Sequence, residues 1–211
     1  MNKESNLFFN NEFALHYDDM VRKQKWYGAE ILLGMIFEYV KAGDKILDLG
    51  IGTGLSAVGF HALGMQVHGL DYSNKMLEIC KQKNIAVDLK EVDLNHTPLP
   101  YRTNFFDHIS ANAILYFLER LDDLFKEISR IIRNNGIWAF IVEENTDPSK
   151  PEIIEKTRGR NGLVTYIHSR PYILNLMRDN GLRLLKKVEF VAENFQMEGK
   201  PVSFVVYVTQ A

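Results

Sequence analysis

The stretch from Lys45 to Gly54 constrains the fold of this chain most. It joins a short apolar run, Ile46 to Leu49, to three glycines at alternate positions, and an amphipathic segment begins at once with Leu55. Strand, glycine turn and helix in this order are typical of the first crossover of a parallel α/β sheet, where ligands bind beyond the carboxyl ends of the strands. Glycine lets the backbone approach a ligand where a Cβ would collide. The stretch therefore predicts a nucleotide-like ligand above the first strand.

The glycine spacing indicates which nucleotide. A dinucleotide fingerprint needs a third glycine three positions after the second, and counting from Gly50 and Gly52 that position is Leu55. Counting from Gly52 and Gly54 it is Ala57, a permitted variant, but the motif would then open too deep in the turn. A P-loop needs a lysine after the last glycine, and this chain has Leu55 there. A nucleoside without a diphosphate fits better.

Two acidic positions follow the next two apolar runs. Asp71 ends the run from Val67, 21 positions after Gly50, where a carboxylate can accept hydrogen bonds from ribose hydroxyls. Helix capping is the alternative interpretation of Asp71, and alone it does not separate NAD from other nucleosides. Asp93 and Leu94 follow the run from 87 to 92, where the carboxylate can accept from an adenine amine and the leucine can wall the ring.

The order of these groups resembles that of the class I S-adenosylmethionine-dependent methyltransferases. Leu99-Pro100 and Phe105-Phe106-Asp107 continue the series before the fourth strand, and the resemblance covers residues 40–145 strongly. Tyr166-Ile167-His168-Ser169 loosely resembles the Williams–Beuren-region-like and small-molecule subgroup. The family resemblance implies a three-layer, Rossmann-like α/β fold. Its sheet would have seven mostly parallel strands in the order 3-2-1-4-5-7-6, with the last strand antiparallel.

The length of 211 residues suits a single methyltransferase domain over 1–211. Residues 1–42 are expected to form an amino-terminal helical cap, with helices from Phe13 to Lys25 and from Trp26 to Val40. Residues 144–170 form a polar insertion, either a lid over the active site or a solvated loop. A helix from 170 to 180 and two final strands, 182–192 and 201–210, complete the expected order.

The composition limits the classes of partner, metal and cellular location that we expect for this protein. The formal net charge is −2 and no basic run exceeds two residues, so nucleic acid is not indicated. Cys80 is the single cysteine, which excludes an internal disulfide and favours a cytoplasmic location. The histidines lack metal-ligand spacing, so no metal is expected. No signal peptide or membrane-spanning run is apparent, and both monomer and homodimer stay open.

The resemblance implies S-adenosyl-L-methionine as the cofactor and assigns its contacts by motif position. The implied set comprises Asp48 near the ammonium, Gly50, Gly52 and Gly54 beside the methionine and ribose, Asp71 on the ribose, Tyr72 and Met76 against the adenine, Asp93 and Leu94 at its edge, Asn112 and Ala113 beside the sulfonium, and Tyr27 covering the cofactor.

Three residues are candidates for catalysis. His168 follows the fifth strand, and a histidine with its ordinary pKa of about 6.5 can act as a base near neutral pH. Tyr17 resembles amino-terminal tyrosines that cover the cofactor in this family, and Tyr116 lies where many members place a histidine. Capping or core packing is the alternative interpretation of His168, and ordinary packing is the alternative for Tyr17 and Tyr116.

We therefore expect methyl transfer by in-line displacement to an oxygen or nitrogen of a small-molecule acceptor. An RNA or protein methyltransferase, docking its acceptor near Lys150 to Arg170, is the first alternative and predicts salt-sensitive binding. A non-catalytic S-adenosylmethionine-binding module is the second. A nicotinamide dehydrogenase is disfavoured by Leu55.

Overall fold

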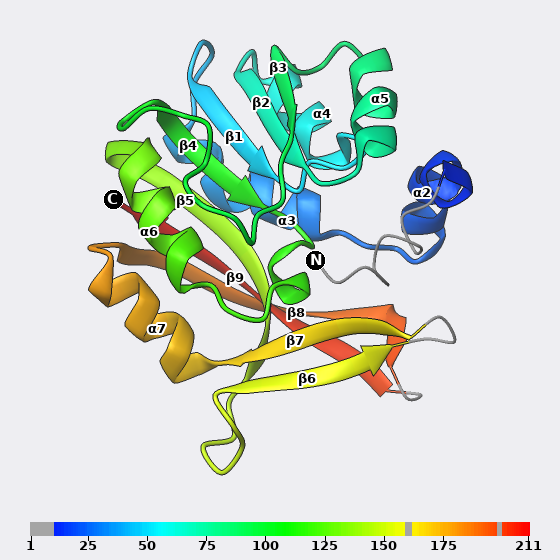
Figure 1. The fold of residues 1–211 in the computed structure, drawn as a ribbon, viewed down its shortest axis with the longest axis vertical. Coiled ribbons are helices and arrows are strands. Elements are labelled where there is room, and N and C mark those ends of the chain that lie inside the picture. Colours follow the sequence, from blue (N-terminus) through cyan, green and yellow to red (C-terminus); the bar gives the residue numbers. More distant parts are fainter. Residues whose placement is uncertain (1–10, 159–161, 198–199) are drawn as a thin grey trace.

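A twisted sheet with helices on both faces organises the chain (Figure 1). The computed structural model describes residues 11–158, 162–197 and 200–211. In chain order its elements are α2 (Asn11–Lys23), α3 (Gly28–Ile36), η1 (Phe37–Tyr39), β1 (Lys45–Leu49), α4 (Leu55–Ala62), β2 (Gln66–Asp71), α5 (Asn74–Gln82), β3 (Asp88–Glu91), β4 (Phe106–Ala111), η2 (Leu115–Phe117), α6 (Asp122–Ile131), β5 (Ile132–Asn145), β6 (Ile153–Arg158), β7 (Leu163–Ser169), α7 (Arg170–Asp179), β8 (Arg183–Met197) and β9 (Lys200–Gln210).

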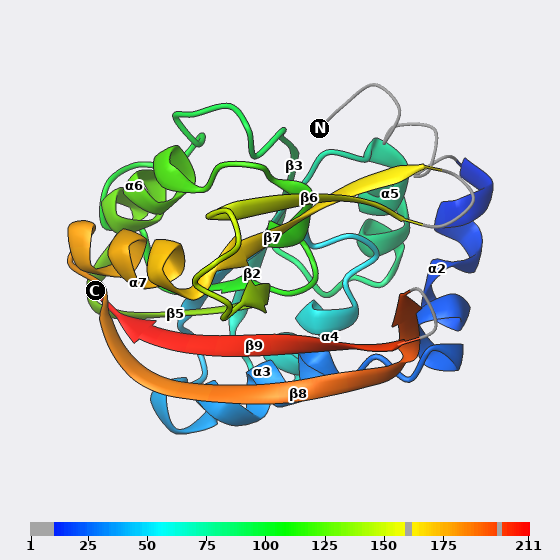
Figure 2. The ribbon, with the colours of Figure 1, turned by 90° about the horizontal axis from the view of Figure 1, so that it is seen from below.

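The strand order confirms the expected fold class. Strands β3, β2, β1, β4 and β5 lie side by side and run parallel. β9 then pairs antiparallel with residues Ile137–Glu143 of β5, and β8 pairs antiparallel with β9. Figure 2 shows these last two strands running together along one side of the molecule. This path, 3-2-1-4-5-9-8, is the predicted order with the last two strands renumbered, because two further strands precede them.

Those two extra strands correct the expected loop between 145 and 160. β6 and β7 form an antiparallel hairpin, and β7 joins the sheet through only two positions, His168 and Ser169, which pair parallel with Glu144 and Asn145. The described part of the sheet therefore has nine strands where seven were predicted. The prediction failed here because β6 has one apolar pair, Ile153-Ile154, before a polar run, so its pattern is that of a solvated segment.

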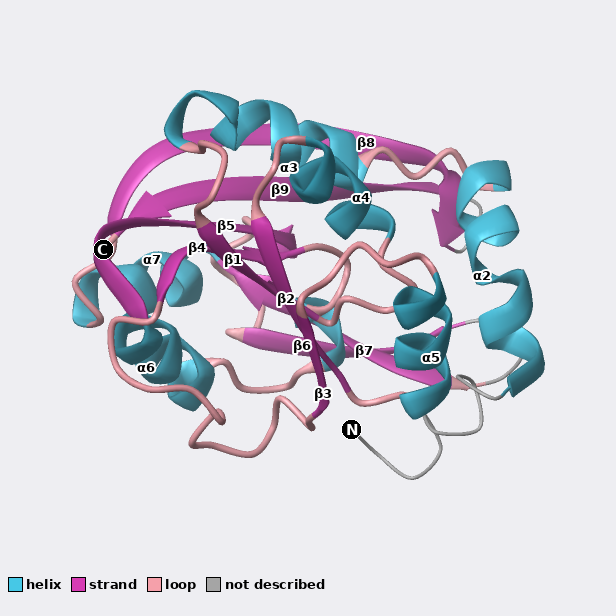
Figure 3. Ribbon diagram, turned by 90° about the horizontal axis from the view of Figure 1, so that it is seen from above, coloured by secondary structure: helices cyan, strands magenta, loops and turns pink. Residues whose placement is uncertain are grey.

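Alternate residues of β5 face opposite helical layers, as the period of a strand requires. Trp138, Phe140 and Val142 pack in the core that contains α6 and α7. Ile137 and Ile141 pack in the core that contains α3 and α4. Figure 3 shows these helix pairs on opposite sides of the sheet, which completes the three layers.

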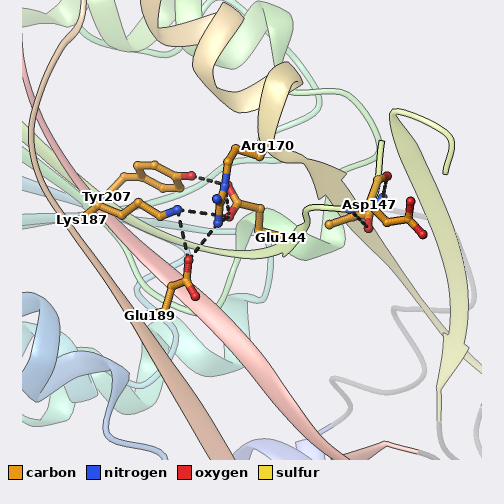
Figure 4. A network of polar contacts seen from close by, with 7 residues as sticks. Glu144, Asp147, Arg170, Lys187, Glu189 and Tyr207 are labelled. Carbon is orange, nitrogen blue, oxygen red and sulfur yellow. Dashed lines mark hydrogen bonds and ion pairs between the residues drawn. The ribbon is translucent and has the colours of Figure 1, made fainter. Parts of the chain in front are cut away.

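A buried carboxylate marks the point where β5 leaves β9 and meets β7 (Figure 4). The side chain of Glu144 is 1% exposed and accepts from the Nε and Nη2 of Arg170, at 2.9 and 2.7 Å, and from the Tyr207 hydroxyl. Glu189 pairs with both Arg170 and Lys187. The pKa of Tyr207 is raised by burial and by its hydrogen bond to Glu144. The network ties the start of α7 and strands β8 and β9 to the end of β5.

The two amino-terminal helices occupy different places. α3 packs against α4 and β5 within the sheet's helical layer, whereas α2 stands at the outer end of the molecule beside α5 (Figures 1 and 3). Residues 1–10 of the expected cap lie outside the described residues. Within the described ranges, no helix has the length and apolar character needed to cross a membrane.

Candidate cofactor site

The glycine turn after β1 has open space on one side. Gly50 and Gly52 have φ values of +65° and +55°, in the region that favours glycine. A Cβ on Gly50 would lie 2.5 Å from the Ile114 side chain, so packing requires this glycine. A Cβ on Gly52 would meet only the Gly50 carbonyl oxygen, at 3.9 Å. Gly52 therefore leaves its backbone accessible to a ligand.

Asp71, at the end of β2, holds this turn in place. Its Oδ2 accepts from the Gly52 backbone N–H and its Oδ1 from that of Ser73, both at 2.8 Å. Burial raises the pKa of Asp71, while these backbone donors oppose the rise. Each carboxylate oxygen has a further lone pair, so Asp71 can also accept hydrogen bonds from a ligand.

A cavity that is partly open to solvent, with about 650 Å³ of empty space, lies above the carboxyl ends of β1, β2 and β4. Nine residues singled out from the sequence line it: Tyr17, Gly50, Gly52, Asp71, Tyr72, Met76, Asp93, Leu94 and Ala113. Ala113 has a φ of +55°, a conformation that costs about 1–3 kcal/mol outside glycine and that is common at functional sites.

A second cavity, of about 890 Å³, lies beside the first and shares Tyr17, Gly50 and Gly52 with it. Tyr27 and Asn112 line this second space. Asn112 accepts from the Trp26 indole N–H at 3.2 Å and donates to the Ser56 hydroxyl at 2.9 Å. The amide is thereby fixed between the α2–α3 connection and α4 at the wall of the cavity.

Tyr17 is the catalytic candidate that lies at the site. Burial raises its pKa to about 12, and the carboxylates of Asp71 and Asp18 add to the rise. The phenol therefore stays protonated at neutral pH and can donate a hydrogen bond.

Two cofactor candidates lie behind the turn and not in either cavity. Asp48 is 2% exposed and accepts from the Ser110 hydroxyl at 2.7 Å. Burial raises the pKa of Asp48 to about 7. Gly54 begins α4, and a Cβ there would lie 2.8 Å from the Cys80 sulfur, so its packing against α5 explains its identity.

The other two catalytic candidates are core residues. His168 is fully buried, and its Nε2–H donates to the Glu119 carbonyl at 3.1 Å. Burial lowers its pKa, which keeps the ring neutral. Tyr116 is 6% exposed and packs against Phe117, with ring centroids 4.5 Å apart. The structure brings neither side chain to the cavities.

Several residues that line the two spaces were not among the site residues predicted from the sequence. They come from the connection after β4, the glycine turn, the ends of β2 and β3, the helices α2, α3 and α4, and the connection between α2 and α3: Ile114, Phe117, Leu118, Ser73, Val92, Val21, Arg22, Lys25, Trp26, Ala29, Glu30, Ile51, Leu55 and Ser56. Of these residues, only those in the connection after β4 could have been predicted from the sequence, because this connection leaves the sheet at the same edge as the glycine turn.

Known proteins share both the core sequence and the fold. A methyltransferase domain family matches residues 47–140. A demethylmenaquinone methyltransferase of Bacillus mycoides is 35% identical over 103 residues, which cover 46% of this chain and 44% of that protein. The chain thus matches less than half the length of this curated relative.

Two solved structures extend the likeness of the fold. One is a chain from the complex between the Haloferax volcanii Trm112 methyltransferase activator and a putative methyltransferase, with a TM-score of 0.75 at 18% identity, covering 95% of this chain and 96% of that chain. The other is geranyl diphosphate C-methyltransferase from Streptomyces coelicolor with S-adenosyl-L-homocysteine, with a TM-score of 0.66 at 18% identity over 86% and 78% of the two chains. The motifs and the topology agree with the matched domain, so residues 47–140 are similar to a methyltransferase domain and the whole chain has the fold of S-adenosylmethionine-dependent methyltransferases.

Proposed function

We propose that the protein transfers a methyl group from S-adenosyl-L-methionine to an oxygen or nitrogen atom of a small-molecule acceptor. The observation that carries the proposal is the pair of adjoining cavities, which meet at Tyr17, Gly50 and Gly52. The first cavity has the groups that a nucleoside needs. The second provides a separate space for an acceptor next to it.

The residues of the first cavity fit the cofactor. Asp71 presents carboxylate oxygens to a ribose, Met76 and Leu94 supply apolar walls for a base, and Gly52 leaves room for close approach. The cofactor, when bound, supplies a sulfonium methyl that is already activated. The main task of the protein is then alignment, which can lower a barrier by about 7–11 kcal/mol.

The lining of the second cavity supports a small, polar acceptor. Trp26, Tyr27 and Leu55 supply apolar surface, and Arg22 and Glu30 supply charge. Such mixed walls suit a compact molecule with a hydrogen-bonding acceptor atom. The name of the curated relative, demethylmenaquinone methyltransferase, supports a small-molecule acceptor but says nothing for a polar one.

Calorimetric titration tests the cofactor assignment. We expect S-adenosylmethionine and S-adenosylhomocysteine to bind with micromolar dissociation constants and NAD not to bind, because the glycine spacing does not favour a diphosphate. Binding of NAD alone would overturn the proposal. Transfer of a labelled methyl group to a pool of small molecules then separates an enzyme from a non-catalytic module. Labelling of RNA or protein instead, with strong salt dependence, would favour the macromolecular alternative.

Gly52→Ala tests the close approach of the cofactor to the turn. The variant is expected to lose about 1–2 kcal/mol of unfolding free energy from its left-handed conformation and to bind S-adenosylhomocysteine more weakly. Gly181→Ala is the matched control, because Gly181 has a φ of +71°, equally open surroundings and a position after α7. Urea unfolding and calorimetry measure the two effects. Equal losses of ligand affinity in both variants would show that Gly52 does not face the cofactor.

A further inference from the structure

Most apolar side chains of helix α2 are only partly buried or exposed. The helix stands apart from the sheet beside α5 (Figures 1 and 3), and Ala14 is its one fully buried apolar side chain among those described. A segment with so little buried apolar surface opens easily unless polar contacts tie it down. Yet α2 carries Tyr17, which lies where the two cavities meet.

A single carboxylate provides these polar contacts. Asp18 Oδ1 accepts from the Thr53 hydroxyl at 2.5 Å, and its Oδ2 pairs with the Lys83 ammonium at 2.6 Å. Thr53 is 1% exposed and lies between Gly52 and Gly54 in the glycine turn. Lys83 is the residue that ends α5. Asp18 thus joins three elements that are far apart in the sequence.

The next residue in the sequence, Asp19, has different contacts from Asp18. Among the described residues, Asp19 pairs only within its own helix, with Arg22 at 3.3 Å, and both side chains are about 70% exposed. It ties α2 to nothing else in the contacts of the described residues. The two adjacent aspartates therefore share charge, helix and neighbourhood, but only Asp18 reaches the cofactor turn.

We propose that Asp18 is a positioning residue that clamps α2 across the junction of the two cavities and thereby sets how long the cofactor stays bound. The inference rests on the proposed function, because it concerns the same site. Breaking the clamp frees α2 and with it Tyr17, so the cofactor loses a wall on the side where α2 lies. Opening of this helix becomes the route by which the cofactor leaves.

Asp18→Ala and Asp19→Ala are the matched pair of variants. Amide hydrogen exchange of the ligand-free protein reports the opening of α2, and stopped-flow displacement reports the dissociation rate of S-adenosylhomocysteine. We expect Asp18→Ala to speed exchange over residues 11–23 and ligand dissociation by about tenfold or more, the effect of losing hydrogen bonds to a charged group. Exchange in β1 and β4 is expected to stay unchanged. Asp19→Ala is expected to leave both rates as in the wild type.

Two further variants keep the test decisive if Asp18→Ala folds poorly. Thr53→Val removes the hydroxyl with little change of shape and is expected to speed both rates, whereas Thr53→Ser keeps the hydroxyl and is expected to restore them. Equal rates in Asp18→Ala and Asp19→Ala, or in Thr53→Val and Thr53→Ser, would overturn the clamp. If the wild type does not bind S-adenosylhomocysteine, the proposed function fails, and exchange of α2 in the ligand-free protein still decides whether Asp18 holds the helix.

Discussion

Asp48→Asn is expected to become more stable relative to the wild type as the pH rises from 4 to 8. The difference in unfolding free energy between the two proteins should change by about 4 kcal/mol over this range. Burial raises the pKa of Asp48 in the folded protein to about 7, from an ordinary value of 3.8. The folded state therefore binds this proton more tightly than the unfolded state does. Stability from this group is present at acid pH and is lost as the pH rises from about 4 to 7, at about 1.4 kcal/mol for each pKa unit. The asparagine side chain does not titrate, so the variant loses no stability at this position as the pH rises.

Urea unfolding of both proteins at several pH values between 4 and 8 measures this difference. Ser110→Ala provides an internal check on the cause. The Ser110 hydroxyl donates to Asp48 and favours its ionised form, so its removal is expected to move the end of the transition to higher pH. Parallel stability curves for wild type and Asp48→Asn across the range would contradict a raised pKa at this site.

The central strands could be predicted because each is a short apolar run that ends at a turn residue. β1, β2 and β4 are buried almost throughout, and such runs leave little choice but a parallel sheet covered on both faces. The cap of α5 by Ser73 and the end of α7 before Gly181 are explained by local chemistry as well, because a serine oxygen accepts from a free N–H of the first turn and glycine adopts the left-handed conformation. The β6–β7 hairpin could not be predicted in this way, since its strands are held by pairing with each other and only briefly with β5.

In the site, too, the residues set by local sequence patterns could be predicted and those set by long-range contacts could not. Glycines and acids at strand ends, such as Gly52 and Asp71, were predictable because the ends of parallel strands meet at one sheet edge. The burial of the Asp48 side chain was not predictable, because its direction depends on pairing with Ser110 of β4. The contacts of Asp18 join positions 35 and 65 residues apart, a relation that no local pattern contains.

The insertion from 144 to 170 shows the limit of a composition argument. Its described residues line neither cavity, although β7 packs against η2, whose Phe117 lines the first. Whether the hairpin acts as a lid stays a prediction. The position of the hairpin is explained by Glu144, a buried carboxylate that contacts Arg170, Lys187 and Tyr207 where β5 leaves β9 and pairs with β7.

Asp71→Ala is expected to weaken the binding of S-adenosylmethionine and S-adenosylhomocysteine by about 1.5–3 kcal/mol, or roughly 10- to 150-fold. The variant removes the carboxylate that faces the first cavity and the acceptor that fixes the Gly52 N–H. Asparagine is no conservative replacement, because one face of its amide carries donors and would leave either Gly52 or Ser73 without an acceptor. Both variants are therefore expected to bind the cofactor poorly.

Glu91→Ala is the control for Asp71→Ala, and calorimetry measures both. Glu91 ends β3, the strand next to β2, and is an exposed carboxylate that accepts from Asn74 at 3.1 Å and lines neither cavity. The Glu91→Ala variant should bind both ligands as the wild type does, since it changes the net charge without removing a group that lines the first cavity. Unchanged affinity in a folded Asp71→Ala protein would mean that the ribose does not lie at the end of β2. The first cavity would then hold some other ligand, because Asp71 is its central hydrogen-bonding group.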